Sequence, residues 1–205
     1  EKELKFFENF DGEIFHSKGL KVSVDGFSKK ISFYQTNPSD WVLIKNANLS
    51  GWNVSFFGIK NKNLNAQEKD QVFNFSGMTG CLNLYNTLFD RTSISVNKAN
   101  CEDGANIVNS MGNIKKIDVK DAGSDALDID FSSVNIDHIK VSNAGNDCVD
   151  VSGGLYKFKI VNLSNCGDKG VSIGEKSELK INKLLVEIAE IGLSSKDLSL
   201  TNVIA

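Results

Sequence analysis

Aspartates recur every 22 residues in the C-terminal half of the chain, within a repeated segment. The copies of this segment span residues 101–107, 123–129, 145–151 and 167–173. Their third positions are Asp103, Asp125, Asp147 and Lys169. A fixed period of this length is typical of a solenoid, in which each repeat stacks on the one before. We therefore expect three carboxylates and one ammonium group in a single column, at strand steps of about 4.8 Å.

Such a column could support acid–base chemistry or hold a cation. Stacked carboxylates repel one another, which raises their pKa values or recruits a shared cation. Raised pKa values suit general acid–base catalysis on a polymer, and clustered carboxylates suit Ca²⁺, the one cofactor that the sequence suggests. The candidate catalytic residues are Asp125, Asp147 and Lys169, and the candidate Ca²⁺ ligands are Asp125, Asp128 and Asp147.

Strand alternation extends the candidate site over one outer surface. If Leu127, Ile129 and Phe131 point inward, Asp128 and Asp130 point outward. We expect Asp125, Asp128, Asp147 and Asp150 to face solvent on one side of the solenoid, in adjacent turns, with Lys169 above Asp147. The candidate substrate-binding residues are Asp128, Asp150, Glu175 and Lys196. Any one of these aspartates is explained more simply by the preference of Asp for corners and solvent-facing positions. Only the constellation argues for function.

The remainder of each repeat predicts an all-β fold, a right-handed parallel β-helix. Apolar residues recur at relative offsets 0, 2, 5 and 7, as in Val134, Ile136, Ile139 and Val141, and again from Tyr156 to Leu163. A step of two is the strand period, and the step of three predicts a bend between two short strands. Helical spacing is not sustained, and the consensus of a leucine-rich repeat is absent.

Two corner columns accompany the strands. Gly123, Gly145 and Gly167 share one position, where we expect a backbone with positive φ. Asp121, Asn143 and Asn165 share another, and we expect these side chains to stack in a structural role.

The four cysteines form two pairs with similar places in the repeat, Cys81 with Cys101 and Cys148 with Cys166. One turn of the chain returns the second cysteine of each pair close to the first, so the spacing favours disulfides over free buried thiols. Disulfides would indicate an oxidising compartment, which predicts a secreted, periplasmic or cell-surface protein.

The 205 residues form one solenoid domain with a cap. We assign residues 1–40 to an irregular N-terminal cap and first turns, and residues 41–205 to the β-helix, with the polar stretch 60–71 looping out. A net charge of −3 without a basic cluster argues against a nucleic-acid partner, and no apolar run reaches membrane length. The start at Glu1 and a last apolar pattern that stops part-way predict a processed product whose final turn is covered by further sequence or a partner.

Residues 123–197 resemble the polygalacturonase-type, pectin-lyase-like glycoside hydrolases. The resemblance lies in Gly-Ser-Asp125, in Asn146-Asp147-Cys148, in Cys166-Gly-Asp-Lys169-Gly-Val-Ser-Ile-Gly and in Ile-Gly-Leu-Ser194-Ser-Lys196. It implies a disulfide between Cys148 and Cys166, Asp125 and Asp147 as the carboxylates that activate water, Lys196 as a substrate-binding lysine, and an acidic polysaccharide as partner.

Three positions depart from the family pattern. Asn146 stands in place of the general acid, Lys169 in place of a histidine and Ser194 in place of an arginine. Two hypotheses follow. The first is a protein that binds an acidic polysaccharide and modifies it by hydrolysis, elimination or epimerisation, with Lys169 as base and Ca²⁺ neutralising the uronate. The second is a non-catalytic structural or adhesive module.

Overall fold

The computed structural model describes residues 2–5, 7, 9–59 and 76–204, and within these ranges every regular element is a β-strand. The predicted loop at 60–71 lies outside the described residues. Over the same ranges, no helix is long and apolar enough to cross a membrane.

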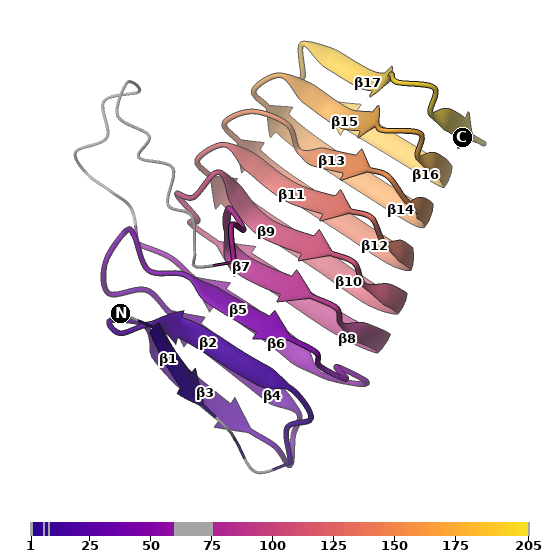
Figure 1. Cartoon of the computed structure of the whole chain (residues 1–205). Coiled ribbons are helices and arrows are strands. Elements are labelled where there is room, and N and C mark those ends of the chain that lie inside the picture. The colour runs from indigo at the N-terminus through magenta and orange to yellow at the C-terminus, as the bar shows by residue number, and fades with distance from the viewer. Residues whose placement is uncertain (1, 6, 8, 60–75, 205) are drawn as a thin grey trace.

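The strands form two sheets that face each other across the core (Figure 1). Sheet A contains β1 (Lys2–Lys5), β2 (Glu13–Ser17), β5 (Val42–Lys45), β7 (Gly80–Tyr85), β9 (Asp103–Val108), β11 (Asp125–Asp130), β13 (Val149–Ser152), β15 (Lys169–Gly174) and β17 (Ile191–Ser195). Sheet B contains β3 (Lys21–Asp25), β4 (Lys30–Tyr34), β6 (Asn53–Phe57), β8 (Leu88–Asn97), β10 (Met111–Ala122), β12 (Ser133–Ala144), β14 (Leu155–Cys166), β16 (Glu178–Glu187) and β18 (Leu200–Val203).

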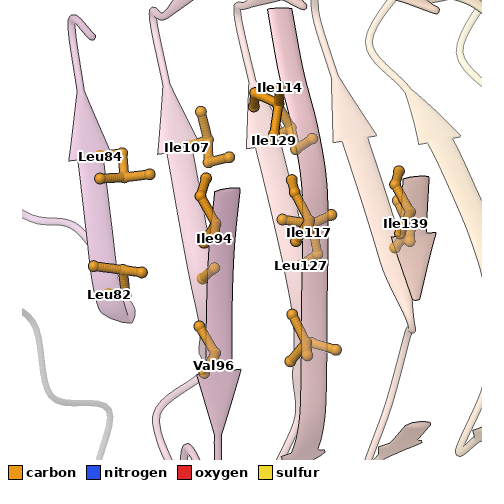
Figure 2. Packing of buried hydrophobic residues seen from close by; sticks show 14 of the residues in the cluster. Leu82, Leu84, Ile94, Val96, Ile107, Ile114, Ile117, Leu127, Ile129 and Ile139 are labelled. Carbon is orange, nitrogen blue, oxygen red and sulfur yellow. The ribbon is translucent and has the colours of Figure 1, made fainter. Parts of the chain in front are cut away.

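The 22-residue period sets the register of sheet A. Ile107, Ile129, Val151 and Ile173 are successive partners in the parallel ladder, and all four are fully buried, as predicted. The chain alternates between the sheets and winds in a right-handed sense (Figure 1). Figure 2 shows Ile107 and Ile129 of sheet A packed against Ile94, Ile114 and Ile117 of sheet B. The prediction of a parallel β-helix is confirmed.

The step of three in sheet B is accommodated inside one strand. The inward residues of β12 are Val134, Ile136, Ile139 and Val141, all of them buried. Between the two pairs, Asp137 and His138 are both exposed, and β12 runs unbroken through them. The expected division into two short strands is therefore wrong, because the ladder continues across the irregular step.

Positive φ occurs in the Asn/Asp corner column and not in the glycine column, contrary to our expectation. Asp121, Asn143 and Asn165 have φ near 60°, and their side chains form a ladder: the Asn143 amide donates to Asp121 at 2.7 Å and the Asn165 amide to Asn143 at 3.0 Å. Close stacking instead requires glycine at two of the three positions, Gly145 and Gly167. A Cβ at Gly145 would lie 2.2 Å from the carbonyl oxygen of Gly123.

The predicted inward position of Phe131 is also wrong. Phe131 follows the last residue of β11, has φ of 47°, and is 59% exposed. The chain turns the corner at this residue, so strand alternation ends at Asp130.

Antiparallel pairing is confined to the N-terminal end. β1 pairs with β2, β2 with β5 and β3 with β4 in antiparallel fashion, whereas the β4–β6 and β5–β7 pairs are parallel. The antiparallel strands close one end of the solenoid, which keeps the first parallel strands of both sheets from being free edges.

Both predicted disulfides are present. Cys81 is bonded to Cys101 and Cys148 to Cys166, each pair with Cα atoms 5.3 Å apart, and no described cysteine is free. Each bond joins the start of one turn to the start of the next. The two bonds indicate an oxidising, extracellular-type environment.

Removing a disulfide should weaken the solenoid without changing its fold. The double substitution Cys148→Ala/Cys166→Ala opens a loop closed over a sequence separation of 18, and we expect it to lower the free energy of unfolding by about 3 kcal/mol. Urea denaturation followed by far-UV circular dichroism measures this change. Equal urea midpoints for the wild type and this variant would contradict the prediction.

Candidate functional site

The predicted catalytic column is a hydrogen-bonded ladder between successive turns. A side-chain oxygen of Asp125 accepts the backbone N–H of Asp147 at 2.8 Å and the amide of Asn146 at 2.7 Å. In the same way, Asp147 accepts the backbone N–H of Lys169 at 2.9 Å. Asp147 is only 3% exposed, so our prediction that it faces solvent is wrong. A carboxylate that satisfies the next turn's backbone has a structural role.

Lys169 lies above Asp147, as predicted, but it is unsuited to the role of base. Its ammonium group contacts Asp168 and lies 3.4 Å from a carboxylate oxygen of Asp147. The hydrogen bond with Asp168, reinforced by Asp147, raises the pKa of Lys169. A lysine base requires a lowered pKa, so the proposed role in elimination or epimerisation has no support.

A second column lies on the outer surface of sheet A. It runs through Asn106, Asp128, Asp150 and Ser172, which are successive partners in the ladder. The Asn106 amide donates to Asp128 at 2.9 Å. Of these residues, we predicted Asp128 and Asp150 as substrate-binding, and both are half-buried in adjacent turns.

Burial and mutual repulsion raise the pKa values of the carboxyls on this surface. Burial is the main cause at each of them, and neighbouring carboxylates add to it. The pKa of Asp128 rises to about 9, that of Asp103 to about 7 and that of Asp150 to about 6. The pKa values of Asp125 and Asp130 are raised as well. Asp128 is therefore a neutral acid at pH 7, able to donate a hydrogen bond, and Asp130 is placed to accept it.

Two of these carboxyls, Asp128 and Asp130, line a pocket of about 470 Å³. Its floor is the outer surface of sheet A, and residues 76–79 form one wall. The polar and aromatic lining residues are Lys45, Ser76, Thr79, Tyr85, Asn106, Asp128 and Asp130. Polar groups that converge in a concave site, among carboxyls with perturbed pKa values, mark this pocket as the candidate binding site.

The remaining predicted residues lie outside this pocket. Asp125 and Asp147 are in the ladder described above, Asp150 is one turn away, and Glu175 and Lys196 are exposed near the far ends of β15 and β17. The charge of Lys196 opposes the rise in the pKa of Asp150. Asp125, Asp147 and Lys169 therefore do not converge on an open cleft.

The structure does not support the predicted Ca²⁺ site at Asp125, Asp128 and Asp147. In the described part of the chain, no group of three or more His, Cys, Asp or Glu side chains is arranged to hold a metal ion. Two of the three proposed ligands are directed at different partners: Asp125 accepts from the turn after it, and Asp128 accepts from Asn106 in the turn before it.

Sequence reasoning missed several residues of the pocket. Asn106 could have been found, because it occupies the position of Asp128 one 22-residue step earlier. Asp130 was placed on the outer surface but not assigned to the site. Lys45, Thr79 and Tyr85 belong to the less regular first turns, where the sequence has no clear period.

A comparison of the chain with protein-family models, curated proteins and solved structures gave no match. The parallel β-solenoid is the class that the fold defines, and the resemblance to polygalacturonase-type enzymes has no support beyond that fold.

The raised carboxyl pKa values predict a protein that is more stable in mild acid than in base. Between about pH 4 and pH 9 the folded chain holds more protons on Asp103, Asp128 and Asp150 than the unfolded chain, because their folded-state pKa values lie above the ordinary aspartate value of 3.8. The free energy of unfolding should therefore fall as pH rises through this range. Urea midpoints measured from pH 5 to pH 9 test it, and midpoints that rise over this range would contradict it.

Asp128→Asn should remove much of this pH dependence. At pH 8 the carboxyl of Asp128 must take up a proton when the chain folds, whereas the neutral amide needs none, so we expect an increase of about 1–2 kcal/mol in the free energy of unfolding at this pH. Asp137→Asn, at an exposed position on sheet B, is the control and should leave the pH profile unchanged. A loss of stability in Asp128→Asn at pH 8 would show that the folded protein needs the charge.

The ladder predicts different results for two substitutions of Asp125. Asp125→Ala leaves the Asp147 N–H and the Asn146 amide without their acceptor, which should cost about 1–3 kcal/mol. Asp125→Asn keeps a carbonyl oxygen at the same place and should change stability by less than about 1 kcal/mol. Thermal denaturation compares the two variants, and equal losses would mean that the charge, not the acceptor, is what matters.

Proposed function

We propose that this protein is a secreted or cell-surface β-solenoid that binds a polysaccharide through the pocket on sheet A. The observation that carries the proposal is the convergence of a neutral carboxyl, an amide, a hydroxyl and a tyrosine on one concave surface. These groups are Asp128, Asn106, Thr79 and Tyr85. The disulfides support an extracellular-type location.

The chemistry of the pocket suits sugar hydroxyls. A hydroxyl both donates and accepts, and the pocket offers a donor in the ammonium group of Lys45 and acceptors in Asp130 and Thr79. Tyr85 is partly exposed at the pocket and adds an aromatic face. A uronate carboxylate would meet the aspartates at an electrostatic cost, with Lys45 the one cationic lining residue among those described. We therefore propose that the units held here are uncharged sugars.

Binding fits the geometry better than hydrolysis does. Glycosidases separate their two carboxyl groups by about 5 Å or more, which leaves room for the sugar or a water molecule. Asp128 and Asp130 lie side by side on the same strand, β11, so they do not stand on opposite sides of a glycosidic bond. We infer a divergent relative of the polygalacturonase-type solenoids that lacks the family's general acid at Asn146 and binds without cleaving.

Glycan binding can be tested by titrating the protein with a panel of uncharged oligosaccharides in a calorimeter, at pH 6. We expect Asn106→Ala to weaken binding by about tenfold, since it removes the amide that donates to Asp128 and positions this carboxyl in the pocket. Asn162→Ala, at an exposed position on sheet B, is the matched control and should bind as the wild type does. Equal affinities for the two variants would exclude the pocket as the site.

The second candidate function is a structural or adhesive rod without a glycan site. The ladder of Asp125 and Asp147 favours it, because these aspartates serve the stacking of turns and face no cleft. Failure of every glycan in the panel to bind, together with no release of reducing ends or unsaturated uronates from acidic polymers, would favour this second function.

A further inference from the structure

The charges of the chain are divided between the outer surfaces of the two sheets. The carboxyls described above gather on sheet A, whereas lysines outnumber acidic residues at the exposed positions of β10, β12, β14 and β16 in sheet B. The acidic residues on those strands are Asp118, Asp121, Asp137, Glu178 and Glu187. The lysines include Lys115, Lys116, Lys157, Lys159, Lys180 and Lys183. Although the net charge is only −3, the outer surface of sheet A is acidic and that of sheet B is basic.

The register of sheet B places like charges next to one another. Lys157 on β14 is the direct partner of Lys180 on β16. Like charges at directly opposed positions destabilise a sheet. Among the described residues neither lysine forms an ion pair, and the one pair on these strands joins Lys116 to Asp118 at 2.6 Å. The chain itself therefore leaves this repulsion largely uncompensated.

Lys157 and Lys180 stand between two hollows on this surface. One hollow, of about 260 Å³, is also lined by Asn135, Asp137, Lys159 and Asn182. The other, of about 580 Å³, shares Asn135, Lys157 and Lys180 with the first, is also lined by Glu178, and extends to β18. The lysines that line the two hollows therefore outnumber the acidic residues. Together they form a shallow, lysine-lined depression that crosses β12, β14 and β16.

We propose that this depression binds an anionic polysaccharide that lies along the solenoid axis. Lysines on successive turns repeat at strand spacing, about 4.8 Å, so a polymer in this direction meets one cation or amide at each step. Carboxylate or sulfate groups compensate the facing lysines, and Asn135 and Asn182 bind hydroxyls.

Other polyanions fit less well. The hollow of about 260 Å³ has no solvent-facing aromatic side chain on which a base could stack, and its cations are lysines, which bind as point charges and not as bidentate guanidinium groups. The disulfides indicate an environment in which acidic glycans, and not nucleic acids, are the ordinary polyanions. This inference concerns a different surface from the glycan pocket of sheet A, so either can fail without the other.

The test compares two double variants with the same change in net charge. Lys157→Gln/Lys180→Gln removes the facing pair, and Lys29→Gln/Lys98→Gln removes two exposed lysines at corners outside the depression. The ligands are an oligogalacturonate for the carboxylate arm, a heparin oligosaccharide for the sulfate arm and dextran as the neutral control. Affinities are measured at about 50 and 200 mM NaCl.

We expect the wild type to bind at least one of the two anionic oligosaccharides, more weakly at the higher salt concentration. Any binding of dextran should be the same in the wild type and in both double variants. Lys157→Gln/Lys180→Gln should raise Kd by about tenfold, and the corner variant by less than about twofold. The melting temperature of Lys157→Gln/Lys180→Gln should be equal to that of the wild type or higher, because the repulsion is relieved. A loss of binding would then not reflect unfolding.

Three results would overturn the proposal. The first is an equal Kd for the two double variants. The second is tighter binding of a single-stranded oligonucleotide or of phosphatidylserine vesicles than of either anionic oligosaccharide. The third is a salt-sensitive dimer, lost in Lys157→Gln/Lys180→Gln, which would assign the basic face to the acidic face of a second copy. Asn106→Ala should leave anionic binding unchanged, which separates this result from the test of the sheet A pocket.

Discussion

The in-register stacking of 22-residue turns is the constraint on which the rest of the structure depends. Each turn must satisfy the backbone of the next, and the chain does so with strand ladders and with columns of polar side chains. Asp125 accepts a backbone N–H from the following turn, and Asn143 extends a corner ladder with Asp121. Two disulfides join neighbouring turns covalently. The aspartates that first drew attention as chemistry are, in part, the means by which the turns are held in register.

Stacking also creates the unusual electrostatics. Equivalent positions on successive turns lie about 4.8 Å apart. A charged residue that recurs at such a position therefore lies next to a residue of like charge. On sheet A the carboxyls respond by keeping protons, with Asp128 neutral at pH 7. On sheet B, lysines such as Lys157 and Lys180 stay exposed to solvent and unpaired among the described residues. The outer surface of sheet A is therefore suited to ligands that form hydrogen bonds, and that of sheet B to ligands that carry negative charge.

The sequence predicts the fold well and the site only in part. The period alone placed Ile129 and Val151 in one buried column, because register in a solenoid follows directly from repeat length. It could not distinguish a carboxylate that faces solvent from one that accepts a backbone N–H, and so it misplaced Asp147. The sequence did not predict that Lys157 and Lys180 face each other. These lysines are 23 residues apart, one residue more than the period, and only the register of sheet B shows that they are partners.

The central claim is that Asp128 is a neutral hydrogen-bond donor in a polar pocket, held so by burial among other carboxyls. Its most direct test is a titration of the aspartate side-chain carbons by ¹³C NMR, with Asp128 assigned through Asp128→Asn. We expect the carboxyl of Asp128 to be still protonated at pH 7 and to titrate near pH 9. Titration near the ordinary aspartate value of 3.8 would contradict the claim.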